Sequence, residues 1–447
     1  MPNIPDAPHK RAITPYWVKA VATLLLVLPI CAGTSASTVQ AEQTISLQQA
    51  LKHTLNQNPS LKVFEFRKHA LNGKLATANL TPAYELSLSA NNVAGSGDYT
   101  GTDQAEWTVA LSSSFELEEH RQARTALANT GLGRLEAQYQ VEALAALGQV
   151  TRAYIQVLAA QERVALAQSA HKLAQKTLAQ VKARAKAGAA PQADVLRAQA
   201  AVSGTQLNVS SMLQTLDYCR VALAALWGET QPNFSRASGD LYQFGEDKSF
   251  TALYERLLQN PAIEVFAAQQ RVQAANLRLT QTQSSSDISW SLGVKQFQQS
   301  NSTALVAGLS KPLFTGSRNK GAVRTANARL HEAAAEKDAA LLRLRTQLYL
   351  AYNNRQQAMQ SVKTLTNEIV PALTQALNDT RKAYQGGRYR YVDYLSARQD
   401  LIAARTALIN AGAAALSYGA EIEQLSSQPL SVAIKAAQPH TFAGQEL

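Results

Sequence analysis

The chain has 447 residues with a formal net charge of +11, and 46% of its residues are hydrophobic but only 6% are aromatic. Its 22 glycines and 14 prolines are few for this length, which excludes collagen-like and low-complexity disordered proteins. Neither the two cysteines nor the seven histidines have the paired spacing of a zinc module. The composition therefore predicts a mostly helical protein that is long enough to bury a sizeable core.

The first 41 residues have the layout of a secretory signal peptide. An uncharged apolar run over residues 20–32 follows three basic residues: Lys10, Arg11 and Lys19. The run is well short of the ~20 residues that a membrane-spanning helix needs. Small residues up to Ala41 suit cleavage before Glu42. We therefore expect an exported mature chain without a helical membrane span.

Cysteine has no expected chemical role in this chain. Cys31 lies inside the expected signal peptide, and the bulky Ile30 before it disfavours a lipoprotein signal. Cys219 is then the only cysteine of the mature chain, so an internal disulfide is excluded. It lies on an apolar stripe with steps of 3 and 4 residues, which predicts a coiled-coil core position and a buried thiol.

The mature chain contains two copies of one sequence unit. Three blocks return in the same order after about 200 residues: 55–75 as 257–277, 153–154 as 351–352, and 188–198 as 387–397. This period is too long for a solenoid, so it predicts the tandem duplication of a large unit. We expect a first repeat over residues 42–235, a second over 236–430 and a C-terminal tail over 431–447.

Each copy is expected to open with a helix of about 30 residues, from Leu47 in the first copy and from Leu253 in the second. Two strands follow, because apolar and polar residues alternate on both sides of a turn rich in Gly, Ser or Asn. A very long helix comes next, over residues 116–187 in the first copy and 322–385 in the second. A glycine ends each long helix, and another helix returns beside it.

The first long helix contains no proline, and at 1.5 Å per residue it spans on the order of 100 Å. Gly131 or Gly133 is a possible site for a kink in it, and Pro371 predicts a bend in the second long helix. Both helices are rich in alanine with narrow apolar stripes, which suits close packing against neighbouring helices. The expected fold class is mainly α with a small β part.

The strands match membrane β-strands in length and in their alternation of apolar with small or polar residues. The alternation alone fits an ordinary half-buried antiparallel sheet equally well. Aromatic residues at strand positions favour a membrane belt: Tyr84, Trp107, Phe115 and Trp290. Four strands cannot close a barrel, so the chain must oligomerise; two copies giving eight strands and three giving twelve both remain open.

The chain resembles the TolC-like outer membrane efflux proteins over essentially its whole mature length. The matching residues are Ser46-Leu47-Gln48-Gln49-Ala50-Leu51, Asn58-Pro59, the Gly188/Asp194/Leu196/Ala198 block and its second copy with Tyr384, Gly387, Asp393 and Leu395. The resemblance implies a homotrimer with a twelve-strand β-barrel in the outer membrane, an α-helical barrel through the periplasm and an equatorial belt.

Two further motifs resemble the branch of this family that serves heavy-metal cation pumps of the cobalt, zinc and cadmium type. They are Phe115-Glu116-Leu117 with Arg121 and Arg124, and Pro312-Leu313-Phe314 with Arg318-Asn319 and Gly321. The resemblance implies the outer membrane channel of a tripartite efflux system, with an inner-membrane pump of RND type and a periplasmic adaptor as partners. Type I protein secretion is the alternative within the same family.

The resemblance also assigns a periplasmic gate. The turns at Gly188 and Gly387 correspond to the periplasmic tip, Asp194 and Asp393 to acidic gate positions, and Tyr384 to a tyrosine that hydrogen-bonds to the first of them. Three positions depart from the family pattern: Tyr389 for an arginine, Ser396 for an acidic residue and Ala193 for a threonine. Arg388 and Arg390 lie close enough in sequence to substitute for the missing arginine.

Local backbone chemistry explains the same turn residues without a gate. Glycine after a helix end relieves a left-handed backbone, and aspartate in the first turn of a helix is favoured by the helix dipole. This capping explanation is the simpler one for either turn taken alone, and both explanations can hold together.

Other classes of function have weaker support. The basic and aromatic cluster Tyr389-Arg390-Tyr391 is typical of nucleic-acid binding, but an exported chain with dispersed charge disfavours it. The sequence has no phosphate loop, nucleophile elbow or His-Glu-x-x-His motif, so we expect neither an enzyme nor a cofactor. A periplasmic coiled-coil adaptor or scaffold remains the rival from another class, although an adaptor would have one helical hairpin instead of two.

Overall fold

The computed structural model describes residues 44–285 and 287–427, all within one compact unit, Glu42–Leu447. The expected signal peptide over residues 1–41 and the expected tail over residues 431–447 lie outside the described residues. All structural statements below concern the described part of the chain.

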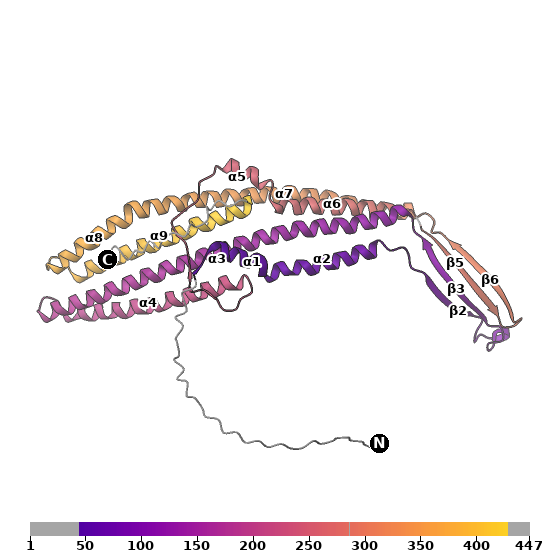
Figure 1. Cartoon of the computed structure of the whole chain (residues 1–447), viewed down its shortest axis with the longest axis horizontal. Helices are drawn as coiled ribbons and strands as arrows, with labels where there is room; N and C mark the ends of the chain where they lie inside the picture. The colour runs from indigo at the N-terminus through magenta and orange to yellow at the C-terminus, as the bar shows by residue number, and fades with distance from the viewer. Residues whose placement is uncertain (1–43, 286, 428–447) are drawn as a thin grey trace, which may run out of the picture. The chain divides into compact units, whose positions relative to one another are not determined.

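The elements follow a similar order twice (Figure 1). The first set is β1 (Thr44–Ile45), α1 (Leu47–Gln57), α2 (Pro59–Ala78), β2 (Glu85–Asn91), the short 3₁₀ turn η1 (Gly97–Tyr99), β3 (Glu106–Phe115), α3 (Glu118–Lys186) and α4 (Gln192–Ala225). The second set is β4 (Arg236–Ala237), α5 (Phe250–Leu257), α6 (Pro261–Thr282), β5 (Ile288–Phe297), β6 (Ser302–Ser310), α7 (Thr315–Thr364), α8 (Val370–Gln385) and α9 (Tyr391–Ser426).

The expectation of a single opening helix in each copy is wrong, because each is broken before a proline. Asn58 caps α2, with its side chain accepting from the backbone N–H groups of Ser60 and Leu61, and Pro59 occupies the first helical position, where no N–H is needed. Asn260 and Pro261 repeat this arrangement at α6. The two helices of each copy are therefore separate elements.

Each capping asparagine also fastens the return helix of its own copy. The Nδ2 atom of Asn58 donates to the backbone oxygen of Leu226 after α4, at 2.8 Å. The Nδ2 atom of Asn260 donates to the backbone oxygens of Gln424 and Leu425 at the end of α9, at 3.0 and 2.7 Å. The repeated Asn-Pro pair is thus a joint between the opening and closing helices of a copy.

The long helices differ in their continuity. α3 runs for 69 residues without interruption at Gly131 or Gly133. α7 ends at Thr364, and a π-helical segment, η2 (Leu365–Ile369), separates it from α8. Pro371 lies in the first turn of α8. At the place where the sequence predicts a bend, the structure thus has a local change of helix type, which accommodates the backbone hydrogen bond that proline cannot make.

The helices pack beside one another along α3. Toward the sheet, α2 and α6 lie on α3, and α7 lies on α6; toward the helical turns, α4 and α9 lie on α3, and α7 and α8 lie on α9. α9 is the one described helix that is long and apolar enough to cross a membrane by composition. Leu401, Leu408 and Ile422 of α9 are buried, which is typical of a core helix in a bundle.

A small parallel sheet of β1 and β4 lies against the middle of α3. The Tyr154 hydroxyl donates to the backbone oxygen of Ile45 at 3.0 Å and also contacts that of Ser238. Gln161 binds both backbone groups of Ala237, at 3.1 and 2.8 Å. Tyr154 and Gln161 of α3 therefore hold β1 and β4 through hydrogen bonds to backbone groups, as a neighbouring strand would.

Four strands form an antiparallel sheet in the order β2-β3-β5-β6. The register places apolar residues opposite one another, as in the row Leu86, Leu111, Leu292 and Ala307 and the row Leu88, Val109, Val294 and Leu305. Residues between these rows are mostly serine, threonine, alanine and glycine. Because side chains alternate between the faces of a sheet, one face is apolar and the other is small or polar.

Candidate functional sites at the two ends of the helices

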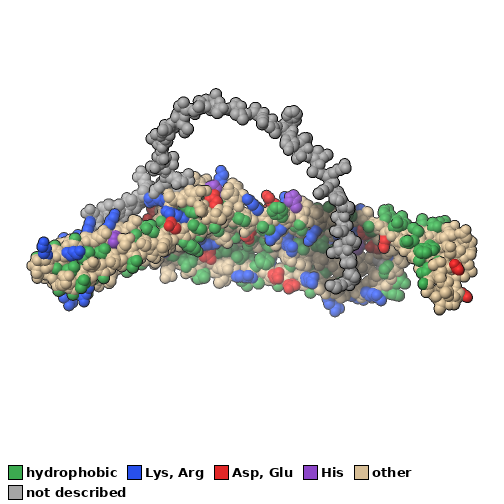
Figure 2. Space-filling model, turned by 90° about the horizontal axis from the view of Figure 1, so that it is seen from below, with side chains coloured by type: hydrophobic (Ala, Val, Ile, Leu, Met, Phe, Trp, Pro, Cys, Tyr) green, Lys and Arg blue, Asp and Glu red, His purple; other side chains and the backbone are tan. Residues whose placement is uncertain are grey.

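The apolar face of the sheet is exposed over most of its area in a single chain. Leu86, Leu292 and Leu305 are 74%, 55% and 81% exposed, on three different strands. A continuous apolar surface of this kind is not left in water by a folded protein. Figure 2 shows hydrophobic side chains at the sheet end of the molecule, where few charged groups appear. The face is therefore suited to contact lipid.

Aromatic residues lie at both ends of this face. Tyr84 and Phe115 each approach Trp290 with ring centroids 6.3 Å apart, at the end next to the helices. Trp107 lies eight residues before Phe115 on β3, which is about 27 Å along a strand and about 21 Å after a barrel tilt of ~40°. That height is close to the ~25 Å apolar band between the aromatic girdles of membrane barrels.

The opposite face of the sheet carries an ion pair. Lys295 Nζ donates to Glu106 Oε2 at 2.9 Å, and both side chains are about three-quarters buried. Gly293 is required on the same face, because a Cβ atom there would lie 2.6 Å from the backbone oxygen of Val109. Small side chains and one internal ion pair make this face suited to line water.

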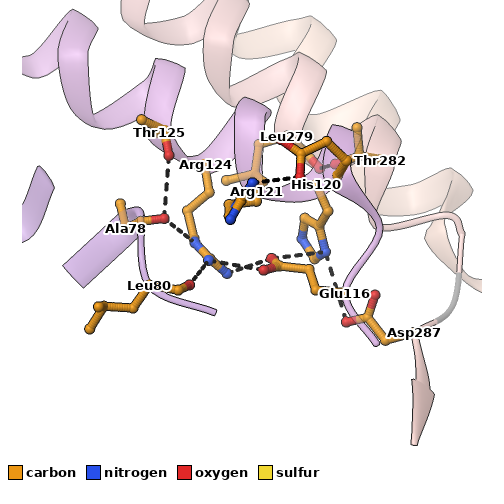
Figure 3. Close-up of polar contacts among 11 residues, drawn as sticks. Ala78, Leu80, Glu116, His120, Arg121, Arg124, Thr125, Leu279, Thr282 and Asp287 are labelled. Atoms are coloured by element: carbon orange, nitrogen blue, oxygen red, sulfur yellow. Dashed lines mark hydrogen bonds and ion pairs between the residues drawn. The ribbon is translucent and has the colours of Figure 1, made fainter. Parts of the chain in front are cut away.

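Arg124 ties the sheet to the helices. Its guanidinium donates to the backbone oxygens of Ala78 and Leu80, at 2.9 and 2.8 Å, and to both carboxylate oxygens of Glu116, at 2.6 and 3.1 Å (Figure 3). The Glu116 side chain is only 5% exposed. One arginine of α3 thus joins the end of α2, the segment before β2 and the segment after β3.

His120 lies beside the same carboxylate. Its Nδ1 atom is 3.8 Å from Glu116 and 3.9 Å from Asp287, so the imidazole lies between a residue of the first copy and one of the second (Figure 3). Sequence analysis noted Glu116 and Arg124 as parts of a motif but did not predict their contact. The pairing of His120 with Asp287 had no signal in the sequence, because 167 residues separate the two.

The two turns at the other end of the helices, which we call the tip, have the same backbone. Gly188 and Gly387 have φ angles of +73° and +77°, which confirms the expected left-handed positions. In each turn the residue after the glycine donates back to the helix, from Ala189 to Arg184 at 2.8 Å and from Arg388 to Ala383 at 2.9 Å. Both helices therefore end in a Schellman motif.

The two tip aspartates have different surroundings. Asp393 accepts from the backbone N–H of Arg390 at 3.0 Å and so caps α9. Asp194 makes no side-chain cap on α4; its side chain is 16% exposed and lies 3.8 Å from the exposed guanidinium of Arg197. Both aspartates lie in the first turn of a helix, where the dipole favours them, but only Asp393 also makes a side-chain cap.

Tyr384 is buried, and its hydroxyl has no hydrogen-bond partner among the described residues. The resemblance implies a hydrogen bond from this tyrosine to Asp194. Within one chain that bond is not formed. Burial raises the pKa of Tyr384, and the nearby charge of Arg184 partly opposes this increase. Its ring packs with those of Tyr391 and Tyr394, at centroid distances of 6.0 and 6.1 Å.

Arg184 connects the two turns. Its Nη1 atom donates to the backbone oxygens of Tyr384 and Gln385, both at 2.7 Å, and its Nη2 atom donates to that of Ala189 at 3.2 Å. The guanidinium also lies 4.8 Å from the centre of the Tyr384 ring. Arg388 and Arg390, which the sequence suggested for this part of the gate, are exposed. The bridging arginine belongs to α3, and its role has no signal in the sequence, because its acceptors are backbone oxygens.

Cys219 is partly buried and packs against the central core, between the buried residues Leu216 and Leu223 of its stripe. Burial raises the pKa of its thiol, which disfavours the reactive thiolate. No group of three or more His, Cys, Asp or Glu that could hold a metal ion is found among residues 44–285 and 287–427.

Comparisons with known proteins agree with this architecture. The family model described as outer membrane efflux protein matches residues 50–229 and 252–426. The cobalt-zinc-cadmium resistance protein CzcC of Cupriavidus metallidurans is 26% identical over 366 residues, which cover 82% of this chain and 86% of CzcC.

Solved structures show the same fold. The outer membrane protein VceC of Vibrio cholerae has a TM-score of 0.67 at 20% identity, covering 86% of this chain and 97% of VceC. The open state of the MtrE outer membrane channel of Neisseria gonorrhoeae has a TM-score of 0.68 at 19% identity, covering 87% and 91%. Because the family model matches well over half of its residues, the chain belongs to the outer membrane efflux protein family.

Proposed function

We propose that three copies of this outer membrane channel assemble head to tail around one axis. The sheet of one chain ends at β2 and β6, and all residues of both strands are exposed. Unpaired strand edges are not tolerated in hydrocarbon, and barrels start at about eight strands. Because β2 and β6 run in opposite directions, β2 of one copy can pair with β6 of the next, and three copies would supply twelve strands.

The helices support the same arrangement. Leu207 and Tyr218 of α4 are more than half exposed on one side of the chain, and Leu342 and Tyr349 of α7 are more than half exposed on the other. Large apolar side chains on two opposite edges suit a heterologous contact, in which one edge of each copy meets the other edge of its neighbour. The mature chain in this assembly would consist of the two repeats, 42–235 and 236–430.

We infer that the assembled channel receives its cargo from an inner-membrane pump of RND type through a periplasmic adaptor. Heavy-metal cations are the proposed cargo, supported by the similarity to a protein named for cobalt, zinc and cadmium resistance. The channel would pass this cargo outward without a chemical step, so no catalytic role is proposed.

The tip is the proposed periplasmic gate of this channel. It would comprise the turns at Gly188 and Gly387 with Asp194, Asp393, Tyr384, Arg388 and Arg390. Arg184 would hold the gate within each protomer, because it binds backbone oxygens of both turns. Arg388 is exposed and would face the neighbouring copies, whereas Arg390 pairs with Asp393 of its own chain.

The observation that carries the proposal is the apolar, aromatic-edged face of a sheet that one chain cannot close. The test expresses the full chain with its pump and adaptor in a host without its own channel. We expect heat-sensitive trimers in the outer membrane fraction and restored growth in cobalt, zinc or cadmium. A matched control carries Leu292→Arg, which places a charge on the apolar face.

Three other outcomes would change the proposal. Restored resistance to organic drugs alone would replace the cargo, and export of a protein substrate would indicate type I secretion. A chain recovered as a soluble periplasmic monomer would contradict the channel and favour the scaffold.

A further inference from the structure

The tip core, the buried cluster that contains Leu377, Tyr384, Tyr391, Tyr394 and Leu401, includes hydrogen-bond donors that have no acceptor among the described residues. Arg398 of α9 is 6% exposed, and neither its Nε nor its Nη1 atom has a partner in this part of the chain. The hydroxyls of Tyr384 and Tyr391, in side chains that are 3% and 2% exposed, also have none. Most buried polar groups in folded proteins are satisfied, so several unsatisfied groups in one place call for a physical explanation.

These groups lie together where α8 meets α9. The rings of Tyr384 and Tyr391 are 6.0 Å apart, and Arg398 follows Tyr391 by two turns on the same face of α9. Helical side chains lean toward the N-terminus of their helix, which directs the arginine toward Tyr391. The positive charge of Arg398 opposes the rise that burial causes in the pKa of Tyr391, as expected for neighbours.

No carboxylate of the described residues forms an ion pair with Arg398. Asp194 and Asp393, the aspartates of the two turns, pair with Arg197 and Arg390 instead. Tyr394, the third tyrosine of the core, is satisfied by Thr177, with 3.0 Å between their hydroxyl oxygens. Arg398 is thus a buried cation without a direct ion pair, which is unfavourable in a protein interior. Among the described residues, Asp194 is the one carboxylate whose charge acts on the neighbouring Tyr384 and Tyr391.

The chemistry of the unsatisfied atoms selects an acceptor. The guanidinium can only donate hydrogen bonds. A tyrosine hydroxyl that accepts a hydrogen bond from it still needs an acceptor for its own O–H group. A small monovalent anion accepts hydrogen bonds from every direction and also neutralises the arginine, whereas a water molecule brings two donors of its own and no charge.

We propose that Arg398, Tyr384 and Tyr391 bind one chloride-sized anion inside each tip core, between α8 and α9. The anion joins the two helices behind the turn at Gly387, where the guanidinium of Arg184 also lies over the ring of Tyr384. The tip then depends on halide for part of its stability. This inference does not require the cargo or the pump partners proposed above.

Bromide provides a direct test, because it replaces chloride and scatters X-rays anomalously. Crystals of the full-length assembly grown in bromide should show one anomalous peak per protomer within hydrogen-bond distance of Arg398. An empty difference map, waters alone, or a carboxylate of a neighbouring copy bound to Arg398 would overturn the proposal.

Thermal unfolding of the same assembly provides the second test. Exchange of chloride for gluconate at constant ionic strength should lower the Tm of the wild type, and Arg398→Met should abolish this halide dependence. Lys176→Met removes an exposed cation of α3 and should retain it. If Arg398→Met does not fold, Tyr391→Phe removes one donor and should weaken the dependence. A halide effect that is unchanged in both variants would contradict the site.

Discussion

The sheet end and the tip of this molecule use side chains in different ways. On the apolar face of the sheet, many leucine, valine and aromatic residues share one task, so removing one apolar side chain matters less than introducing a charge. At the tip, a few polar side chains make bonds that nothing else replaces, such as those of Arg184 to both turns. Substitution should therefore act through polarity and position at the sheet, and through residue identity at the tip.

The largest effect is expected on the apolar face of the sheet. Leu292→Arg, in the middle of β5, should destabilise each chain by about 2–4 kcal/mol, because it places a charge in hydrocarbon. In a trimer the cost arises three times, so folded trimers should be lost from the outer membrane. The shift of heat-modified bands on gels measures this loss.

Ser291→Arg is the matched control, since the neighbouring residue lies on the polar face. It should assemble normally. If both variants failed to assemble, or both assembled equally well, the two faces would not differ as described.

The sequence predicted this end of the molecule well, for a physical reason. A strand's alternation with a period of two can be read from its own residues. The two faces of the sheet, and the strand positions of Trp107, Phe115 and Trp290, could therefore be predicted without tertiary information. The family resemblance and the mainly α fold class are likewise confirmed by the family model and the solved structures.

The sequence predicted the tip less well. Gly188 and Gly387 were predictable, since a left-handed turn after a helix favours glycine. The Arg184 bridge was not, because its acceptors are backbone oxygens about 200 residues away and leave no mark in the sequence. The break at Asn58 differs from the prediction for another reason: the apolar pattern continues across it and predicts one helix, whereas the Asn-Pro pair starts a new helix at Pro59.

At the tip, we expect the largest effect from Arg184→Ala. The variant loses three hydrogen bonds to backbone oxygens and the contact with the Tyr384 ring, which together contribute about 1–3 kcal/mol. The turns should separate more easily, so single-channel conductance in planar bilayers and vancomycin entry should rise while trimers persist.

Lys182→Ala, an exposed residue two positions before Arg184 on α3, is the control and should change neither measurement. Equal conductance of the wild type and Arg184→Ala would show that the bridge does not restrain the tip.

A smaller effect should distinguish the two aspartates. Asp393→Ala removes the cap of α9 and should cost about 0.5–1 kcal/mol, whereas Asp194→Ala removes no cap and should cost less than about 0.5 kcal/mol. Hydrogen exchange in the first turns of α9 and α4 measures both effects. The double variant should raise conductance if the aspartates also act as a gate; unchanged conductance and vancomycin entry would leave Asp393 with its cap and Asp194 with its favourable place in the helix dipole alone.

The smallest expected effect is a pH dependence that belongs to the tip only. Burial raises the pKa of Tyr384 and Tyr391 above the usual value of about 10. A group whose pKa is raised by folding contributes its full stabilisation below its unfolded pKa and loses it as the pH rises through the folded pKa.

Hydrogen exchange at the tip should therefore accelerate above pH ~10 by more than the ordinary base catalysis seen in the central part of α3. Tyr391→Phe should reduce the excess, because phenylalanine has no proton to lose. An excess that persists in Tyr391→Phe, or that appears equally in the sheet, would show that buried tyrosines do not set the pH response of the tip.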